Sequence, residues 1–309
     1  MQEQNPPEGL EPVAVKRRIF LKQAAAAAAA LSTLLPLNTS SAREDETRRK
    51  AVTRGRVQQS IVHWCFQKHW DIEATCQVAR ELGCKSVELV SPESWANLKK
   101  HGLTCAIAGS HGFDKGMNNP KYHAMCLQKI QDAIDACADH GFPNVITFTG
   151  FREDIPDEEG IKNCVEGYKK ILGHAEKKKV NLCLEMLNSR VNIEMKGHPG
   201  YQGDHTEYCM EIIRQVGSPR MKLLFDIYHV QIMDGDIIQR IHQYKDYIGH
   251  YHTAGNPGRA ELDDKQEINY RPIMEEIVKT GYTGFVGQEF IPTRDPLRGL
   301  REAVALCDV

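Results

Sequence analysis

Four polar residues, each at the end of a short apolar run, carry the clearest sign of chemistry in this sequence. They are Glu185, Asp226, His252 and Glu289, and the intervals between them are 41, 26 and 37 residues. Intervals of this size suit one β-strand plus one helix, and a barrel enzyme gathers the carboxyl ends of its strands at one mouth. Carboxylates and imidazole are common ligands of divalent cations. The spacing therefore predicts one metal site at the mouth of a barrel.

Each of these residues also has a simpler interpretation when it is taken alone. A carboxylate at a strand end often caps the next helix or pairs with an arginine. An isolated buried carboxylate is very costly, so each one must face solvent, a metal or a partner group. Because the pattern recurs in four successive units, a shared site is the better interpretation.

Alternating strand and helix patterns in the rest of the chain would position these residues. Eight strands are predicted at residues 57–65, 86–90, 104–108, 145–149, 180–185, 222–226, 248–252 and 285–289. Eight helices are predicted at residues 72–82, 95–101, 120–140, 159–178, 206–216, 236–244, 270–280 and 296–307. Strands that alternate with helices pair in parallel through crossover connections. The pattern predicts a single α/β domain over residues 57–309, folded as a (β/α)8 TIM barrel.

Further polar residues near the strand ends are candidates for substrate binding. His229 follows Asp226 by three residues, where it could hydrogen-bond a substrate hydroxyl or serve as a packing or capping residue. Arg259 follows a turn rich in glycine and proline, where it could hold a carboxylate or phosphate or form a structural salt bridge. Asn188 lies in a long loop that is typical of a lid or specificity surface. His111 lies in the loop after the third predicted strand, which should line the same mouth unless it is an ordinary turn.

Composition and cysteine usage exclude several classes of partner and cofactor. The 309 residues carry a formal net charge of -2, whereas binding to nucleic acid normally requires a basic face, so no nucleic-acid partner is predicted. No G-x-G-x-x-G motif follows the first predicted strand, which argues against a dinucleotide cofactor. The ten cysteines are scattered without a C-x-x-C pair, so they are predicted to be small buried apolar residues rather than disulfides or zinc ligands.

The first 42 residues resemble a twin-arginine export signal. Arg17 and Arg18 precede Phe20 and Leu21, then an alanine-rich apolar segment, and then small residues up to a cleavage site after Ala42. The alternatives are an alanine-rich helix or an uncleaved membrane anchor, but the apolar segment is shorter than the roughly 20 residues that span a bilayer. The sequence predicts a signal peptide at 1–42, a charged linker at 43–56, and export to the periplasm by the twin-arginine machinery.

Six segments of the second half of the chain carry a further resemblance, at residues 184–190, 216–219, 225–231, 254–259, 267–270 and 281–289. In these segments the chain resembles the hydroxypyruvate isomerase family, within the xylose isomerase-like superfamily of sugar isomerases and epimerases. The resemblance implies a (β/α)8 barrel with one divalent metal held by Glu185, Asp226, His252 and Glu289, and with Glu185 and Glu289 as the acid/base pair. Hydroxypyruvate isomerases carry glutamine at the position of His252, whereas keto-sugar epimerases carry histidine. The resemblance therefore indicates the reaction class more firmly than the substrate.

The predicted reaction moves a carbonyl between adjacent carbons, or inverts a carbon beside one, through an enediolate. A metal chelated by the substrate oxygens would stabilise that charge, and two glutamates would take up and return the proton. Oxygen and nitrogen ligands without thiolate favour Mn²⁺ or Mg²⁺, with Zn²⁺ or Co²⁺ as alternatives. The expected substrate is a small hydroxy-keto acid or carbohydrate, and export favours a free sugar or sugar acid from outside the cell.

Two other functions compete with this prediction. One is a metal-dependent dehydratase that acts on a keto-sugar or keto-inositol at the same site, and the other is a non-catalytic carbohydrate-binding barrel. A three-zinc phosphodiesterase would require more histidine and aspartate ligands than the sequence offers. The sequence leaves a homo-oligomer open.

Overall fold

Parallel strands form the centre of the computed structural model, which describes residues 50–309 of the chain. The predicted export signal and most of the predicted linker lie outside the described residues. In residues 50–309 the sheet has seven strands in the order β2-β1-β7-β6-β5-β4-β3, and all neighbours are parallel. The strands are β1 (Gln58–Val62), β2 (Ser86–Glu88), β3 (Asn144–Thr147), β4 (Asn181–Glu185), β5 (Met221–Asp226), β6 (Ile248–Thr253) and β7 (Phe285–Gln288).

The segment 104–108, predicted as the third strand, is irregular. It joins β2 and β3 through two isolated parallel bridges, Ser86 with Thr104 and Ala108 with Val145, and through a backbone hydrogen bond from the Leu89 N–H to the Ile107 carbonyl. Side chains take the place of the missing ladder, since the Ala106 N–H donates to Ser86 Oγ at 2.8 Å and Asn144 Nδ2 donates to the Ala106 carbonyl at 2.8 Å. The prediction of eight regular strands is therefore wrong by one, although this segment still lies between its two expected neighbours.

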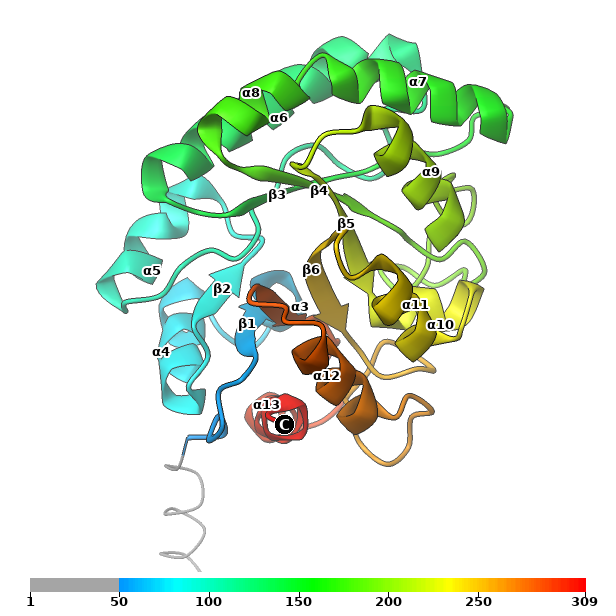
Figure 1. Cartoon of the computed structure of the whole chain (residues 1–309). Coiled ribbons are helices and arrows are strands. Elements are labelled where there is room, and N and C mark those ends of the chain that lie inside the picture. The colour runs from blue at the N-terminus through cyan, green and yellow to red at the C-terminus, as the bar shows by residue number, and fades with distance from the viewer. Residues whose placement is uncertain (1–49) are drawn as a thin grey trace, which may run out of the picture. The chain divides into compact units, whose positions relative to one another are not determined.

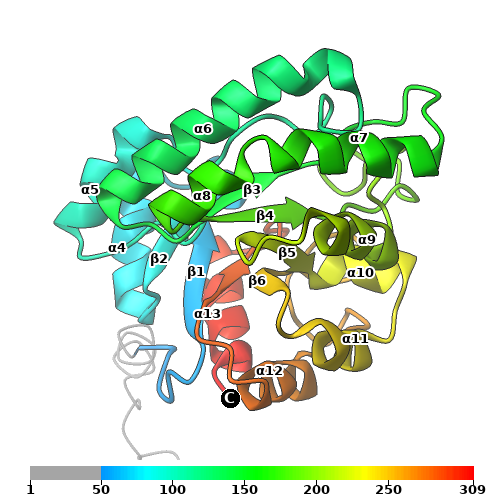
Figure 2. The same cartoon turned by 45° about the horizontal axis from the view of Figure 1, so that its top comes forward.

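Helices surround the strands on the outside, as Figures 1 and 2 show. The last helix, α13, lies beside β1 in both views, so the end of the barrel domain returns to its beginning. This arrangement is that of the predicted TIM barrel. The helices are α3 (His63–Phe66), α4 (Ile72–Leu82), α5 (Trp95–Lys100), α6 (His123–His140), α7 (Asp157–Lys169), α8 (Leu172–Lys178), α9 (Thr206–Val216), α10 (Ile227–Met233), α11 (Ile237–Tyr244), α12 (Tyr270–Lys279) and α13 (Pro296–Cys307), with 3-10 turns at Pro92–Ser94 and Pro120–Tyr122.

Three elements differ from the predictions. The first strand ends at Val62 rather than 65, because the next four residues form the short helix α3. This helix buries Cys65 and Phe66, and Phe66 stacks on Trp70. The helix predicted at 159–178 is two helices, α7 and α8, separated at Lys170 and Ile171. The helix α10 was not predicted. It begins directly at the end of β5, where the Asp226 side chain accepts hydrogen bonds from two backbone N–H groups of its first turn.

The chain entering the barrel is tied to the chain leaving it. The Asp308 carboxylate accepts hydrogen bonds from the backbone N–H groups of Thr53, Arg54 and Gly55, at 2.6, 2.7 and 2.7 Å. Residues 51 and 52 donate to the Leu82 carbonyl. Residues 51–55, which the sequence analysis assigns to the linker, therefore pack on the barrel.

The two layers of the core follow the alternation of side chains along each strand. Leu182 and Leu184 of β4 belong to the large core between strands and helices, whereas Cys183 belongs to a smaller cluster inside the barrel with Leu224 and Ile146. All ten cysteines are free and buried, as predicted. Among the described helices, none has the length and apolar character needed to cross a lipid bilayer.

Candidate metal centre and substrate cavity

Strand alternation explains why the four predicted ligands meet. Each of them comes two residues after a residue of the barrel interior: Glu185 after Cys183, Asp226 after Leu224, His252 after His250, and Glu289 after Gly287. Because side chains repeat every two residues along a strand, all four point inward at the carboxyl ends of neighbouring strands. One ligand atom from each lies within 4.8 Å of the others, and all four residues are buried.

His252 occupies the middle of this cluster. Its Nδ1 lies 2.8 Å from Glu289 Oε2 and 3.5 Å from Glu185 Oε1. Neither Nδ1 nor Glu185 Oε1 has a hydrogen-bond partner within the described residues, although both are fully buried. Buried polar atoms are almost always partnered, and a cation between these two atoms would give both of them a partner.

Arg259 joins the cluster to the loop after β4. Its Nη2 donates to Glu289 Oε2 at 2.6 Å and lies 3.4 Å from Asp226 Oδ2, while its Nη1 donates to the Met195 carbonyl at 2.6 Å. Arg259 as a whole is only 2 % exposed. It therefore offsets part of the negative charge at the site. Nη1 and Nη2 already donate within the protein, whereas Nε has no hydrogen-bond partner among the described residues.

His229 and Asn188, both predicted to bind substrate, are in contact with each other. The Asn188 backbone N–H and its side-chain Nδ2 both donate to His229 Nδ1, at 3.0 and 2.7 Å. A neutral imidazole that accepts at Nδ1 carries its hydrogen on Nε2, and this Nε2 lies 3.5 Å from Asp226 Oδ2 without a hydrogen-bond partner among the described residues. Burial and the charge of Arg259 hold the pKa of His229 well below its usual range, so the ring is a neutral donor facing the cluster.

A cavity of about 320 Å³ opens over Glu185 and Glu289. Its walls combine aromatic and apolar side chains with a few polar groups, as is typical of a small-molecule site. Those walls include Trp64, Leu89, His111, Phe113, Phe148, Leu187, His198 and Arg259. The Trp64 indole N–H donates to Glu289 Oε1 at 3.1 Å, which anchors that carboxylate at the cavity edge.

His111 lines the cavity, but both of its ring nitrogens have partners within the protein. Its Nδ1 donates to the carbonyls of Gly112 and Lys115 at 2.9 and 3.1 Å, and its Nε2 lies 2.9 Å from Thr147 Oγ1. The ring therefore shapes the wall and holds its own loop. Asn188 is not among the lining residues, and it approaches the site through His229.

Glu88 is the buried site residue that the sequence analysis missed. It ends β2, and its Oε1 lies 2.9 Å from Nε2 of both His250 and His252. Burial would raise the pKa of Glu88, but the two imidazoles outweigh that effect and lower it to about 2. Glu88 was passed over because it lies inside the strand predicted at 86–90 rather than at its end, and because it precedes Glu185 by 97 residues, a longer interval than those between the four ligands.

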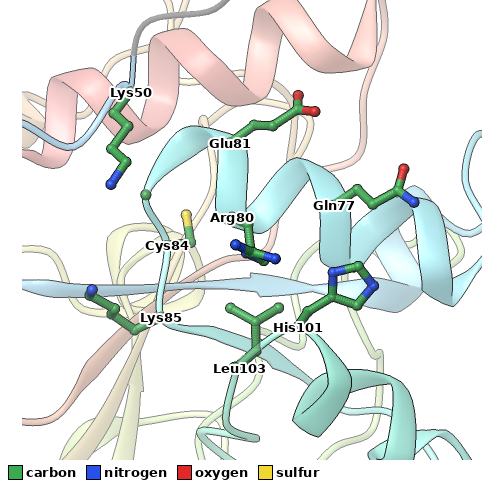
Figure 3. Close-up of a pocket in the computed structure, with 10 residues that line it drawn as sticks. Lys50, Gln77, Arg80, Glu81, Cys84, Lys85, His101 and Leu103 are labelled. Carbon is green, nitrogen blue, oxygen red and sulfur yellow. The ribbon is translucent and has the colours of Figure 1, made fainter.

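Another hollow, of about 660 Å³, lies at the amino ends of the strands (Figure 3). It is lined by residues just before β2 and before the segment 104–108, including Lys50, Arg80, Lys85 and His101. None of the residues predicted to bind metal or substrate lines it. The chemistry is therefore expected at the carboxyl ends of the strands.

The electrostatics of the cluster follow from crowded carboxylates with little water. Burial raises the pKa of Asp226 to about 7, with Glu289 and Glu185 adding to the effect and Arg259 opposing it. Burial and the nearby Glu289 also raise the pKa of Glu185. For Glu289, Arg259 and His252 outweigh burial and hold its pKa well below the usual range. The same carboxylates raise the pKa of His252 well above its usual range. A divalent cation at this position would favour the ionised forms of Asp226 and Glu185.

The residues present fit a divalent cation. Three carboxylates and one imidazole supply hard oxygen donors and one nitrogen, without a thiolate, and this set suits Mn²⁺ or Mg²⁺ and admits Zn²⁺ or Co²⁺. The unpartnered Glu185 Oε1 and His252 Nδ1 are two of the atoms that such an ion would contact.

Comparisons with known proteins agree with the fold and the resemblance. The model of a family described as "Xylose isomerase-like TIM barrel" matches residues 76–308. A putative hydroxypyruvate isomerase of Xenopus laevis is 35% identical over 263 residues, which cover 77% of this chain and 91% of that protein. A 2-oxo-tetronate isomerase of Cupriavidus necator is 31% identical over 234 residues, which cover 71% and 86%. The resemblance to hydroxypyruvate isomerases is thus confirmed.

Among solved structures, a 3-keto-D-glucoside 4-epimerase from E. coli superposes with a TM-score of 0.67 at 18% identity, covering 82% of this chain and 98% of that one. A protein titled AP endonuclease, family 2, from Brucella melitensis gives a TM-score of 0.67 at 24% identity, covering 79% and 96%. At these identities the likeness concerns the fold alone.

Proposed function

The chain belongs to the xylose isomerase-like TIM barrel family, and we propose that it is a metal-dependent isomerase or epimerase. The substrate is a small hydroxy-keto acid or sugar, in line with relatives named hydroxypyruvate isomerase and 2-oxo-tetronate isomerase. The observation that carries the proposal is the convergence of Glu185, Asp226, His252 and Glu289, with their donor atoms within 4.8 Å of one another, beneath a cavity of about 320 Å³.

The metal would be held by Glu185, Asp226, His252 and Glu289, and when bound it would stabilise the negative charge that develops on the substrate oxygens, worth several kcal/mol. The strand order β7-β6-β5-β4 places Glu289 and Glu185 on either side of the other two residues. The two glutamates therefore flank the substrate, and each can take a proton from carbon or return one.

Proton handling by these two glutamates decides the outcome of the reaction. If one carboxylate both removes and returns the proton on one face, the result is isomerisation, and if the two work from different faces, the result is epimerisation. Trp64 and Arg259 donate to the two oxygens of Glu289 and hold its carboxylate in place. His229 is fully buried and is not among the residues that line the cavity, so its Nε2 hydrogen would reach a substrate oxygen only beside Asp226, whose Oδ2 lies 3.5 Å away.

Hydrogen exchange into substrate tests this function directly. In deuterated water, the Mn²⁺-loaded or Mg²⁺-loaded protein is expected to introduce deuterium next to the carbonyl of at least one compound from a panel of hydroxypyruvate, four-carbon 2-oxo acids and neutral ketoses. Proton NMR follows the loss of the carbon-bound proton of the substrate. Samples with Mg²⁺ are measured directly, and samples with Mn²⁺ are measured after the ion has been removed by a chelator, because Mn²⁺ broadens proton signals. Water elimination would instead indicate a dehydratase, and saturable binding without exchange would indicate a carbohydrate-binding barrel.

Export to the periplasm remains a proposal that rests on the twin-arginine pattern at Arg17 and Arg18. Replacing both arginines with lysine is expected to keep the full-length chain in the cytoplasm, because the export machinery reads the paired guanidinium groups. Cell fractionation and immunoblotting measure the outcome. Unchanged export of the double variant would contradict the assignment.

The sequence leaves a homo-oligomer open, and oligomeric state is left as an open part of this proposal.

A further inference from the structure

Glu88 makes a paired contact that the proposed reaction does not use. Its Oε1 accepts from the Nε2 atoms of both His250 and His252, at 2.9 Å each, and all three side chains are fully buried. A carboxylate only accepts hydrogen bonds, so each imidazole carries its hydrogen on the nitrogen that faces Glu88.

The hydrogen bond from Nε2 to Glu88 affects whether the other ring nitrogen of His252, Nδ1, has a lone pair for a cation. A neutral ring with its hydrogen on Nε2 has a free lone pair on Nδ1, and Nδ1 faces Glu289 Oε2 at 2.8 Å and Glu185 Oε1 at 3.5 Å. The other tautomer, like the protonated ring, would place a hydrogen on Nδ1, which would donate to Glu289 and leave no lone pair for a cation. The ring therefore needs a fixed acceptor behind it to work as a ligand.

The neighbouring residues leave room for the Glu88 carboxylate and hold it in place, and Gly287 on β7 provides the room. A Cβ at position 287 would collide with Glu88 Oε1 and lie 2.9 Å from His252 Cδ2. The absence of a side chain there makes room for the contact. His250 lies two residues before His252 on β6, so the two side chains face the same side of the strand. It gives the same Glu88 oxygen a second donor and limits the rotation of the carboxylate.

We propose that Glu88 is a positioning residue that fixes the orientation and tautomer of His252, so that Nδ1 presents its lone pair to a divalent cation. The inference rests on the proposed metal site and names a residue outside its four ligands. Loss of a carboxylate behind a histidine ligand typically weakens metal binding by about 10-fold to 100-fold.

Metal affinity of the Glu88→Gln variant tests the proposal without reference to turnover. Mn²⁺ is titrated into full-length protein, and electron paramagnetic resonance measures the free ion. We expect the dissociation constant to rise by about 10-fold to 100-fold in Glu88→Gln. The matched control is Glu81→Gln, which makes the same change on the exposed surface of α4 and is expected to bind Mn²⁺ like the wild type. An Mn²⁺ affinity of Glu88→Gln within twofold of the wild type would overturn the proposal.

A second measurement on the unaltered protein covers the case in which Glu88→Gln does not fold. In Zn²⁺-loaded protein with ¹⁵N-labelled histidine, the Nε2–H protons of His250 and His252 are expected as protected, strongly downfield signals. Finding the His252 hydrogen on Nδ1 would overturn the proposal. Two bound ions per chain in the wild type, one of them lost in Glu88→Gln, would also overturn it, because Glu88 would then be a ligand. Absence of deuterium exchange into substrate would count against the proposed function alone.

Discussion

Replacing Glu289 with glutamine is expected to lower the rate of proton exchange into substrate by about 10²-fold to 10⁴-fold, the usual contribution of a positioned general acid or base. Glutamine keeps the shape of the side chain and one oxygen that can accept from Trp64 or Arg259, the two donors that hold Glu289 in place. It removes the carboxylate that can take a proton from carbon. NMR of substrate in deuterated water, at saturating metal, measures the rate.

The control for this prediction is Glu166→Gln, the same change at an exposed position on α7. That variant should exchange at the wild-type rate. Substrate binding by Glu289→Gln, measured by calorimetry, should remain within a few-fold of the wild type because the cavity walls are intact. If Glu289→Gln turns over normally, Glu289 is not part of the acid/base pair. If it loses metal as well as turnover, its role is that of a ligand, and Glu185 becomes the candidate for both proton transfers.

The convergence of the four ligands could be predicted because it depends only on local sequence and the period of a strand. An apolar run that ends in a polar residue predicts a strand and places the last side chain of that strand at the mouth of the barrel. Glu185, Asp226 and Glu289 follow this pattern. The same reasoning fails for segment 104–108, where the Ser86 and Asn144 side chains bond the backbone of Ala106. Hydrogen bonds of this kind, between a strand backbone and side chains of other strands, depend on residues far away in the sequence.

The partners of the predicted site residues could not be predicted for the same reason. Glu88 and His252 are 164 residues apart, and their contact requires β2 and β6 to face each other across the barrel. Asn188 was predicted to bind substrate, but its side chain contacts His229 and is not among the residues that line the cavity. Arg259 has the charge expected of a carboxylate clamp, yet its donors bind Glu289 and the Met195 carbonyl. Sequence reasoning identified the polar residues of the mouth and could not assign their hydrogen bonds.

Asp226 allows the metal site to be tested while the local backbone is preserved. Its side chain caps α10 by accepting from the backbone N–H groups of Tyr228 and His229. Asparagine caps helices about as well as aspartate, so Asp226→Asn keeps the cap and removes one negative charge from the cluster. Because ligand charge strongly tunes the affinity for hard cations, we expect Mn²⁺ affinity to fall by about 100-fold or more, with exchange activity falling in parallel. Calorimetric Mn²⁺ titration measures the affinity.

Asp295→Asn is the matched control, since Asp295 caps α13 by accepting from the Arg298 N–H and is exposed. Asp295→Asn should bind Mn²⁺ like the wild type.

The wild type and Asp226→Asn should also differ in how their Mn²⁺ affinity responds to pH. Burial holds the pKa of Asp226 at about 7 in the metal-free protein, so a proton competes with the cation below that pH and wild-type affinity should rise as the pH increases through 7. Asp226→Asn has no such proton to lose, and its weaker affinity should rise less steeply. Equal Mn²⁺ affinity in Asp226→Asn and Asp295→Asn would place the metal elsewhere, because both variants keep a helix cap and only Asp226→Asn removes a charge from the cluster.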